Sequence, residues 1–383
     1  MSKTNKSNKA IKYRLYPNNE QKVLFAKTFG CYRFVYNQLL ALQKQKYKDG
    51  ESHLSKFKLN EYTNHSLKRD YEFLKEVDKF AISNAAFHLA DAYDRFFKKQ
   101  NRSPNFKSKK KAKKSYTTNF TNNNILIGEN VIKLPKVGMV KAVIHRLPKD
   151  EWKLKSVTIS QNSVGDFFAS VLFEYEQGQI PVISKFSPNA IGLDYKSDGL
   201  YMDSNGNKPG VHKYYRESYD KLAKEQRKLS RKMGSKKNEV KSNNFFKQMK
   251  KVNKIHKKIA NQRLDSLHKK STEIANQYDI ICVEDLNIKA IGNKRFGNGK
   301  ATYDNGYGMF LNMLAYKLQD RGKHFVKVDK WYPSSQICHC CGSIKKLVLK
   351  DRIYTCDCGY SGNRDHNAAI NILIEGLRIL QSL

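Results

Sequence analysis

The chain has 383 residues, which is enough for two or more domains that each bury a hydrophobic core. Its 72 Lys and Arg against 35 Asp and Glu give a formal net charge of +37, and its 22 Tyr and 20 Phe can stack on unpaired bases, so nucleic acid is a better predicted partner than a membrane surface. No run of 18 apolar residues occurs and residues 1–17 lack a signal-peptide core, so we expect a cytoplasmic protein with no membrane partner.

The first half of the chain predicts one strand, a group of helices and then several short strands. Residues 10–16 alternate in polarity and predict a strand. Apolar residues at helical spacing over 20–45 and 66–98 predict a helical bundle inserted after it. From residue 115 to 183 the period changes to two, with turn residues between short runs, which predicts a small antiparallel barrel that the first strand joins.

A lysine run separates these two regions. Residues 106–114 contain six lysines, a pattern that fits either a solvated linker or a loop that contacts phosphates, with neither favoured by the sequence. As candidate nucleic-acid contacts we take Lys107, Lys109, Lys110 and Lys111.

The second half predicts a mixed sheet of the ribonuclease-H type. A buried strand over 190–195 carries Asp194 and is followed by a hairpin strand over 200–202, and a second buried strand over 279–284 ends in Glu284. A glycine-rich segment over 288–308 predicts a mobile loop, a helix follows over 309–318, and a further strand covers 324–329.

A pair of helices between the first two of these strands is strongly basic. Residues 213–258 contain 17 Lys and Arg against 4 acidic residues, so the exposed faces of the pair are expected to lie along nucleic acid. Their apolar stripe predicts a core contact, and no small-molecule cofactor is expected.

Three acids are candidates for a shared catalytic site. Asp194 and Glu284 lie at the ends of buried strands, where an acid seldom occurs without a partner, and Asp365 stands at the start of the last helix. In a ribonuclease-H-like sheet such acids converge and hold two Mg²⁺ or Mn²⁺ ions for phosphodiester hydrolysis. Each acid also has an ordinary alternative, as a helix cap or as a member of an ion pair.

Five of the seven cysteines lie together before that helix. Cys338 and Cys341 have the spacing of a zinc knuckle, and Cys356 and Cys358 form a shorter second one, with a predicted Val-Leu and Ile-Tyr hairpin between them. Because the second knuckle has a single intervening residue, Cys340 or His339 is an alternative ligand, and reduced thiols without metal are the other interpretation. We expect a zinc ribbon that supplies structure rather than catalysis.

The chain resembles the TnpB family, the RNA-guided nucleases of bacterial insertion sequences that are related to type V CRISPR effectors. The combination of Pro-Ser-Ser-Gln, CxxC and Arg-Asp-x-Asn-Ala-Ala is highly specific, and the matching segments occur in the family's order. These segments are Tyr13–Pro17, Phe29-Gly30 with Arg33–Asn37, Glu76–Ala81, Phe120–Asn124, Lys133–Pro135, Val283–Leu286, Tyr332–Gln336 and Arg364–Ala369.

The resemblance implies an α+β multidomain protein. It places a wedge-type β-barrel at 1–18 and 115–186, a helical recognition lobe at 19–114, a RuvC nuclease domain at 187–330 and 362–383, and a zinc-bearing target-nucleic-acid-binding insert at 331–361. It gives RuvC roles to Asp194, Glu284 and Asp365 and places Lys79, Phe80, Thr121 and Asn122 where relatives read a short DNA motif.

The implied activity is RNA-guided cutting of double-stranded DNA next to a transposon-adjacent motif, with a transposon-end guide RNA and a nucleoid-associated location. A miniature type V CRISPR effector and a nuclease-inactive repressor are the alternatives, and the intact acids disfavour the second. Three features depart from the family pattern: Lys196 stands where glycine is common, the second knuckle is CxC, and Asn363 replaces a common Asp.

Overall fold

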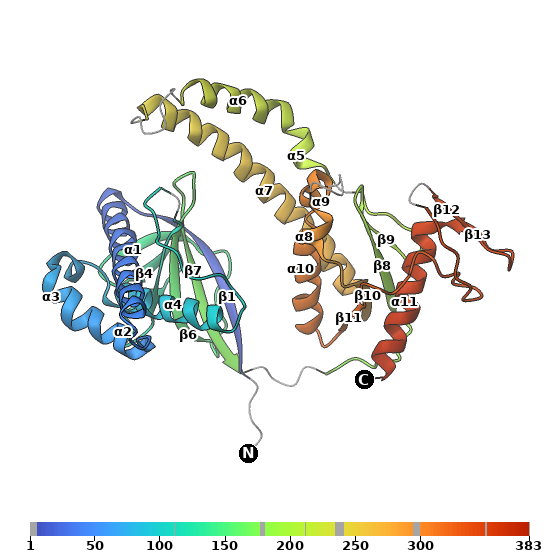
Figure 1. The fold of residues 1–383 in the computed structure, drawn as a ribbon, viewed down its shortest axis with the longest axis horizontal. Helices are drawn as coiled ribbons and strands as arrows, with labels where there is room; N and C mark the ends of the chain where they lie inside the picture. Colours follow the sequence, from blue (N-terminus) through green and yellow to red (C-terminus); the bar gives the residue numbers. More distant parts are fainter. Residues whose placement is uncertain are drawn as a thin grey trace, which may run out of the picture. The chain divides into compact units, whose positions relative to one another are not determined.

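A computed structural model of the protein describes residues 6–110, 112–176, 181–210, 212–233, 241–293, 299–348 and 351–382. The chain forms two compact units, Met1–Gly178 and Gln179–Leu383 (Figure 1). No helix in the described part of the chain is long and apolar enough to cross a membrane.

The first unit is built on one antiparallel sheet whose strand order is β2-β6-β7-β1-β5-β4-β3. The strands are β1 (Lys6–Tyr16), β2 (Lys114–Asn119), β3 (Leu126–Ile127), β4 (Val131–Leu134), β5 (Gly138–Val143), β6 (Lys153–Gln161) and β7 (Phe167–Glu176). The first strand pairs with both β7 and β5, so it joins the later strands as predicted. Among the described residues the pairing leaves β2 and β3 as edges, and closure into a barrel stays a prediction.

Helices pack on this sheet and share one core with it. They are α1 (Asn19–Lys48), α2 (Lys56–Tyr62), the π-helix η1 (Thr63–Leu67), α3 (Lys68–Asp70), the 3₁₀-helix η2 (Glu72–Lys75) and α4 (Lys79–Phe97). Buried residues of β1, α1 and α4, such as Tyr13, Phe25 and Leu89, belong to a single apolar cluster. The predicted helical segment over 66–98 is interrupted, because Tyr71 leaves helical geometry at φ −132° and Asp78 caps α4 by accepting a hydrogen bond from the Phe80 N–H at 3.0 Å.

The second unit contains the predicted mixed sheet, with strand order β11-β10-β8-β9. The strands are β8 (Ala190–Lys196), β9 (Leu200–Asp203), β10 (Ile280–Glu284) and β11 (His324–Val328). Strands β8, β10 and β11 are parallel and β9 is antiparallel to β8. The last helix, α11 (Arg364–Ser382), packs across β8, β10 and β11.

Two glycines bring α11 into close contact with the sheet. A Cβ on Gly192 of β8 would lie 2.2 Å from the Ala369 carbonyl oxygen, and one on Gly376 of α11 would lie 2.3 Å from the Cys282 sulfur of β10. Such distances leave no room for a side chain, so the helix backbone lies directly on the strands. This contact fixes the start of α11 relative to the ends of β8 and β10.

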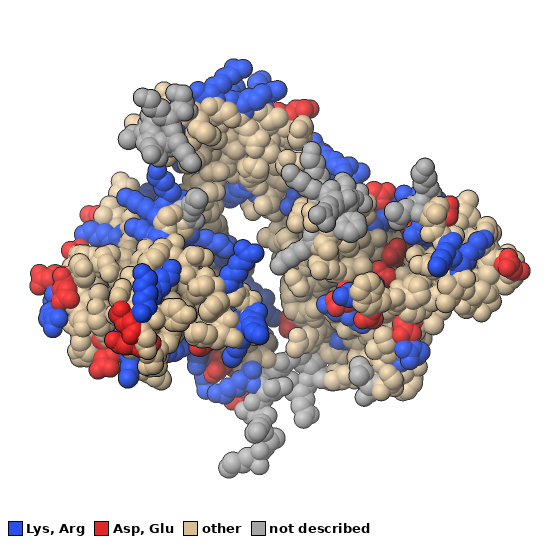
Figure 2. All heavy atoms as spheres, viewed as in Figure 1, with Lys and Arg blue, Asp and Glu red and all other residues tan. Residues whose placement is uncertain are grey.

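The other helices of this unit are α5 (Tyr214–Glu217), α6 (Tyr219–Arg231), α7 (Asn243–Gln277), α8 (Ile288–Ile291), α9 (Gly299–Asn305) and α10 (Tyr307–Gln319). Helices α6 and α7 form the predicted pair, with Leu222, Val252 and Ile259 buried, and Lys and Arg side chains gather over α6 (Figure 2). The predicted reversal near Gly234 lies outside the described residues.

The prediction of a mobile loop over 288–308 is wrong for its second half. Residues 299–305 form α9, and the side chains of Thr302, Asp304, Asn305 and Tyr307 are buried. Arg263 of α7 donates to Asp304 at 2.9 Å, which ties α9 to the unit. The glycines in this segment suggested a loop, but buried polar side chains with hydrogen-bond partners elsewhere in the unit hold the segment in place.

The cysteine segment contains a short hairpin of β12 (Ile353–Thr355) and β13 (Ser361–Asn363). Among the described residues, Ile353 and Tyr354 pair with the segment after the second knuckle, whereas Leu349 of the predicted Val-Leu strand lies outside the described residues. Tyr354 is fully buried and its hydroxyl donates to the Gln336 carbonyl at 3.1 Å and the Ser343 carbonyl at 3.3 Å, so it connects the hairpin to the residues on both sides of the first knuckle.

Candidate functional site

Asp194 and Glu284 lie side by side because of the strand register. Cys282 pairs with Gly192 and Val283 with Leu193 on neighbouring parallel strands, so the next residues in sequence are Glu284 and Asp194. The carboxyl ends of parallel strands share one edge of a sheet, which is where ligand sites form in such folds. The two acids that sequence analysis singled out therefore meet at that edge.

Asp365 lies in the first turn of α11, close enough to Asp194 for its carboxylate to raise the pKa of that residue. It is not the helix cap, because Asn363 accepts hydrogen bonds from the Asp365 N–H at 2.9 Å and the His366 N–H at 3.2 Å. The alternative account of Asp365 as an N-cap is thus wrong, and the residue that replaces a common Asp in the family does the capping. The Asp365 carboxylate is left to face the acids of the strands.

Like charges and burial dominate the electrostatics of these acids. Burial, followed by the Glu284 and Asp365 carboxylates, holds the pKa of Asp194 well above its ordinary range, and burial raises the pKa of Glu284. A carboxylate cluster of this kind is stabilised by a cation, and hard oxygen donors suit Mg²⁺ or Mn²⁺. The carboxylate oxygens of the three acids therefore suit a divalent metal. Among the described residues, these oxygens do not all lie within 4.8 Å of one another.

A lysine already lies among the acids. The Lys196 ammonium donates to Asp365 Oδ2, and both side chains are 18% exposed. It also counteracts the rise in the pKa of Asp194. The ion-pair alternative for Asp365 is therefore present in the structure, with a partner that sequence analysis noted only as a departure from the family pattern.

Two further residues contact this site and were missed in the sequence. Ser334 is buried and its hydroxyl donates to Glu284 Oε1 at 2.5 Å, which orients that carboxylate. Tyr307 is fully buried, its hydroxyl has no hydrogen-bond partner among the described residues, and both Asp194 and Glu284 raise its pKa further after burial. The family motif around Ser334 was a signal for the first residue, whereas nothing in the sequence marked the second.

Two asparagines of α11 connect the acids to the cysteine segment. Asn371 donates to the Ser334 carbonyl at 2.8 Å and to the Ile337 carbonyl at 2.7 Å. Asn367 donates to the Ile337 carbonyl at 2.6 Å and accepts from the His339 N–H at 3.1 Å. The Asn-Ala-Ala-Ile-Asn run thus holds the segment that carries Ser334 and the first knuckle.

Four thiols form a second candidate metal site. The sulfur atoms of Cys338, Cys341, Cys356 and Cys358 all lie within 4.8 Å of one another. The Cys338 and Cys358 sulfurs are 3.7 Å apart, and the Cys341 and Cys356 sulfurs are 3.5 Å apart. Two sulfurs bound to one tetrahedral zinc ion by bonds of about 2.3 Å lie roughly 3.8 Å apart, so the observed separations are close to those of a zinc site. The hydrogen bond with the Ser343 hydroxyl lowers the pKa of Cys341 to about 6, which favours the thiolate.

The alternative ligands have other contacts. Cys340 is exposed, with its sulfur 3.4 Å from His339 Nε2, and His339 Nδ1 lies 2.8 Å from Asn367 Oδ1. Neither residue belongs to the group of four thiols. The geometry favours the CxC knuckle as the second pair of ligands.

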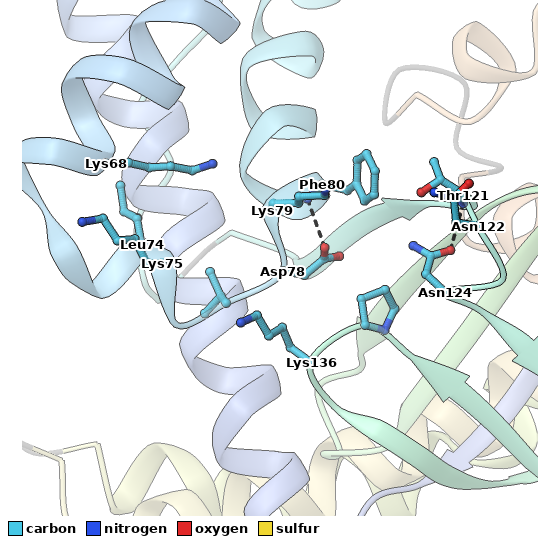
Figure 3. A pocket seen from close by; sticks show the side chains of 12 residues that line it. Lys68, Leu74, Lys75, Asp78, Lys79, Phe80, Thr121, Asn122, Asn124 and Lys136 are labelled. Atoms are coloured by element: carbon cyan, nitrogen blue, oxygen red, sulfur yellow. Dashed lines mark hydrogen bonds between the residues drawn. The ribbon is translucent and has the colours of Figure 1, made fainter.

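The candidate motif-reading residues line one pocket of the first unit. Lys79 and Phe80 lie at the start of α4, and Thr121 and Asn122 lie in the turn after β2, on the other side of the pocket (Figure 3). Lys68, Lys75 and Lys136 add positive charge to its lining. The pocket has basic, aromatic and amide groups, which are the groups that contact phosphates and base edges.

The lysine run divides into exposed and half-buried members. Lys107 is half-buried, with its ammonium 3.6 Å from the centroid of the Tyr36 ring and 3.4 Å from the Tyr32 hydroxyl, and burial lowers its pKa to about 8. The role of Lys107 as a phosphate contact stays a prediction. Lys109 and Lys110 are exposed, and Lys111 lies outside the described residues.

Three family models match the chain. The model described as "Helix-turn-helix domain" matches residues 6–52, the OrfB_IS605 model "Probable transposase" matches 186–295, and "Cas12f1-like, TNB domain" matches 307–372. Residues 6–52 fold here as β1 and the single long helix α1. The other two matches cover the acidic site and the thiol cluster.

A relative from Streptomyces pristinaespiralis, named "Putative RNA-guided DNA endonuclease", is 32% identical over 96% of this chain and 89% of its own length. The chain belongs to the TnpB family. InsQ of Escherichia coli K12, another TnpB relative with the same description, is 29% identical over 97% of this chain and 93% of its own. A Cas12f1 chain solved with its guide RNA and target DNA shares the fold at a TM-score of 0.56 and 13% identity, over 96% of this chain and 98% of that one.

Proposed function

We propose that this TnpB protein is a metal-dependent, RNA-guided DNA endonuclease of an insertion sequence. The observation that carries the proposal is the convergence of Asp194, Glu284 and Asp365 at one edge of the mixed sheet, in a chain whose family is shown over nearly its whole length. Mg²⁺ or Mn²⁺ held by these acids would supply activation of water and stabilisation of charge in phosphodiester hydrolysis. Ser334 orients Glu284, and the first turn of α11 presents Asp365.

The proposed domains follow the family. They are a wedge-type barrel at 1–18 and 115–186 with a helical recognition lobe at 19–114, then a RuvC domain at 187–330 and 362–383 with a zinc-bearing insert at 331–361. The separations between the four sulfurs support zinc at Cys338, Cys341, Cys356 and Cys358.

The proposed partners are a guide RNA from the transposon end and double-stranded target DNA. The basic surface over α6 would lie along nucleic acid, and the pocket of Lys79, Phe80, Thr121 and Asn122 would read the transposon-adjacent motif. A nuclease-inactive repressor is disfavoured because all three acids are present and the Glu284 and Asp365 carboxylates raise the pKa of Asp194. A miniature CRISPR effector would have the same residues and a different source of RNA.

The test begins with the RNA that copurifies with the protein. We expect this RNA to carry a transposon end followed by a variable guide, and we expect the complex to cut matched plasmids from a library with a randomised motif only next to one short sequence. RNA without a guide segment, or cutting that ignores the match, would reject the function.

The two exposed lysines of the run offer a test of RNA binding. Because each phosphate contact releases counterions, Lys109→Ala combined with Lys110→Ala is expected to reduce the slope of log affinity against log salt by about 1.5 to 2. Filter binding at several salt concentrations measures that slope. Lys107→Met is the matched control and should leave the slope unchanged, since Lys107 is packed on Tyr36. An unchanged slope in the double variant would show that the run is a solvated linker.

A further inference from the structure

Lys196 is aimed at the acids by the strand on which it lies. Side chains two residues apart on a strand share a face, so Asp194 and Lys196 of β8 point the same way. The Asp-x-Lys pattern therefore places a carboxylate and an ammonium group on the same face of β8, at its carboxyl end. The end of β8 is also fixed, because Asn305 donates to the backbone carbonyls of Lys196 at 3.2 Å and Ser197 at 2.6 Å.

The contact of Lys196 uses an oxygen that a metal would need. Its ammonium donates to Asp365 Oδ2, and the pair is largely withdrawn from solvent, with 18% of each side chain exposed. A divalent cation shared by Asp194 and Asp365 would meet both the occupied oxygen and the repulsion of a neighbouring positive charge. At short range and partial burial this repulsion is only weakly screened by solvent.

We propose that Lys196 competes with the divalent metal for Asp365, so that the nuclease site is completed only at a higher metal concentration than the three acids alone would require. The inference rests on the proposed function, because it concerns the metal of that same site. The ion pair offsets part of the negative charge of the acid cluster in the metal-free protein, and the lysine has to turn away from Asp365 when metal enters. The chain would thus respond to the concentration of free Mg²⁺ through one side chain.

The test measures the binding of Mn²⁺ alone to the full-length, zinc-loaded protein, from the electron paramagnetic resonance signal of free Mn²⁺. Lys196→Met and Lys196→Gln are expected to bind Mn²⁺ on the order of tenfold more tightly than the wild type. Lys196→Arg keeps the charge and should stay within about twofold. Asp365→Asn, which removes the contested ligand, should weaken binding in both the wild-type and the Lys196→Met backgrounds.

Equal or weaker binding by both neutral variants would overturn the inference, and so would binding that is insensitive to Asp365→Asn. Guided cleavage by the wild type, measured separately, shows whether the role of Lys196 alone is wrong or the proposed nuclease function as well. Equal affinities together with intact cleavage overturn only the role of Lys196, whereas absence of cleavage at every metal concentration overturns the nuclease function. In a successful case the Mg²⁺ concentration for half-maximal cleavage falls in Lys196→Met in parallel with the Mn²⁺ dissociation constant.

Discussion

Asp194→Ala, Glu284→Ala and Asp365→Ala are each expected to abolish cleavage of both DNA strands, by at least about 10³-fold, while guided DNA binding is retained. At the proposed site the three carboxylates hold the same metal, so removal of any one would leave an incomplete set of ligands. The pocket of the first unit and the basic surface over α6 do not involve these acids, which is why binding should persist. Cleavage of a matched plasmid and a gel shift of the same target, made side by side, measure the two effects.

The matched control is Asn363→Ala. Asn363 caps α11, so its loss is expected to cost about 1 kcal/mol of stability and to leave cleavage measurable. This variant separates damage to the helix start from loss of a ligand. Near wild-type cleavage by Asp365→Ala would show that the site consists of two acids only.

Cys338→Ser is expected to lose the zinc ion and to disorder the segment around it. We expect about one zinc per wild-type chain by elemental analysis and nearly none in the variant, because each thiolate supplies a quarter of a tetrahedral site. Cleavage should fall as well, since Ser334 and Ile337 precede Cys338 and carry the contacts to Glu284, Asn367 and Asn371.

Cys340→Ser is the control for this second prediction. Its sulfur lies outside the group of four, so zinc content and cleavage should match those of the wild type. Loss of zinc in Cys340→Ser with retention in Cys358→Ser would mean that the ligand set has to be redrawn. Zinc-free wild-type protein, freshly purified, would contradict the metal site as a whole.

The strand acids could be predicted because a carboxylate at the end of an apolar strand is costly without a partner, and strand order then brings two such acids together. The four thiols were predictable for a similar reason, since a metal imposes a spacing on the chain. Both patterns can be recognised in a short stretch of sequence, and both reflect a large energetic cost of leaving the side chains without a partner. That is why the sequence alone could single out Asp194, Glu284 and the cysteines, whose roles as metal ligands stay predictions.

Contacts between distant segments could not be read in this way. The Lys196–Asp365 pair spans 169 positions, Tyr307 lies in a segment whose glycines predict a loop, and Lys107 looks like any other lysine of its run. In each case tertiary packing decides the surroundings of the side chain, and local propensity carries no information about it. The interruption of the 66–98 helix near Tyr71 and Asp78 belongs to the same class.

Because α11 packs directly on the sheet, the three acids can come together only after the ribosome has released this helix. Gly192 and Gly376 let the last helix lie directly on β8 and β10, and that helix supplies both Asp365 and the asparagines that hold the zinc segment. A ribosome-bound chain that has not yet released residues beyond 363 carries two acids and no third. At the proposed site, a chain truncated before Arg364 by a premature stop codon would lack one of the three acids, and we expect it to be unable to cut DNA.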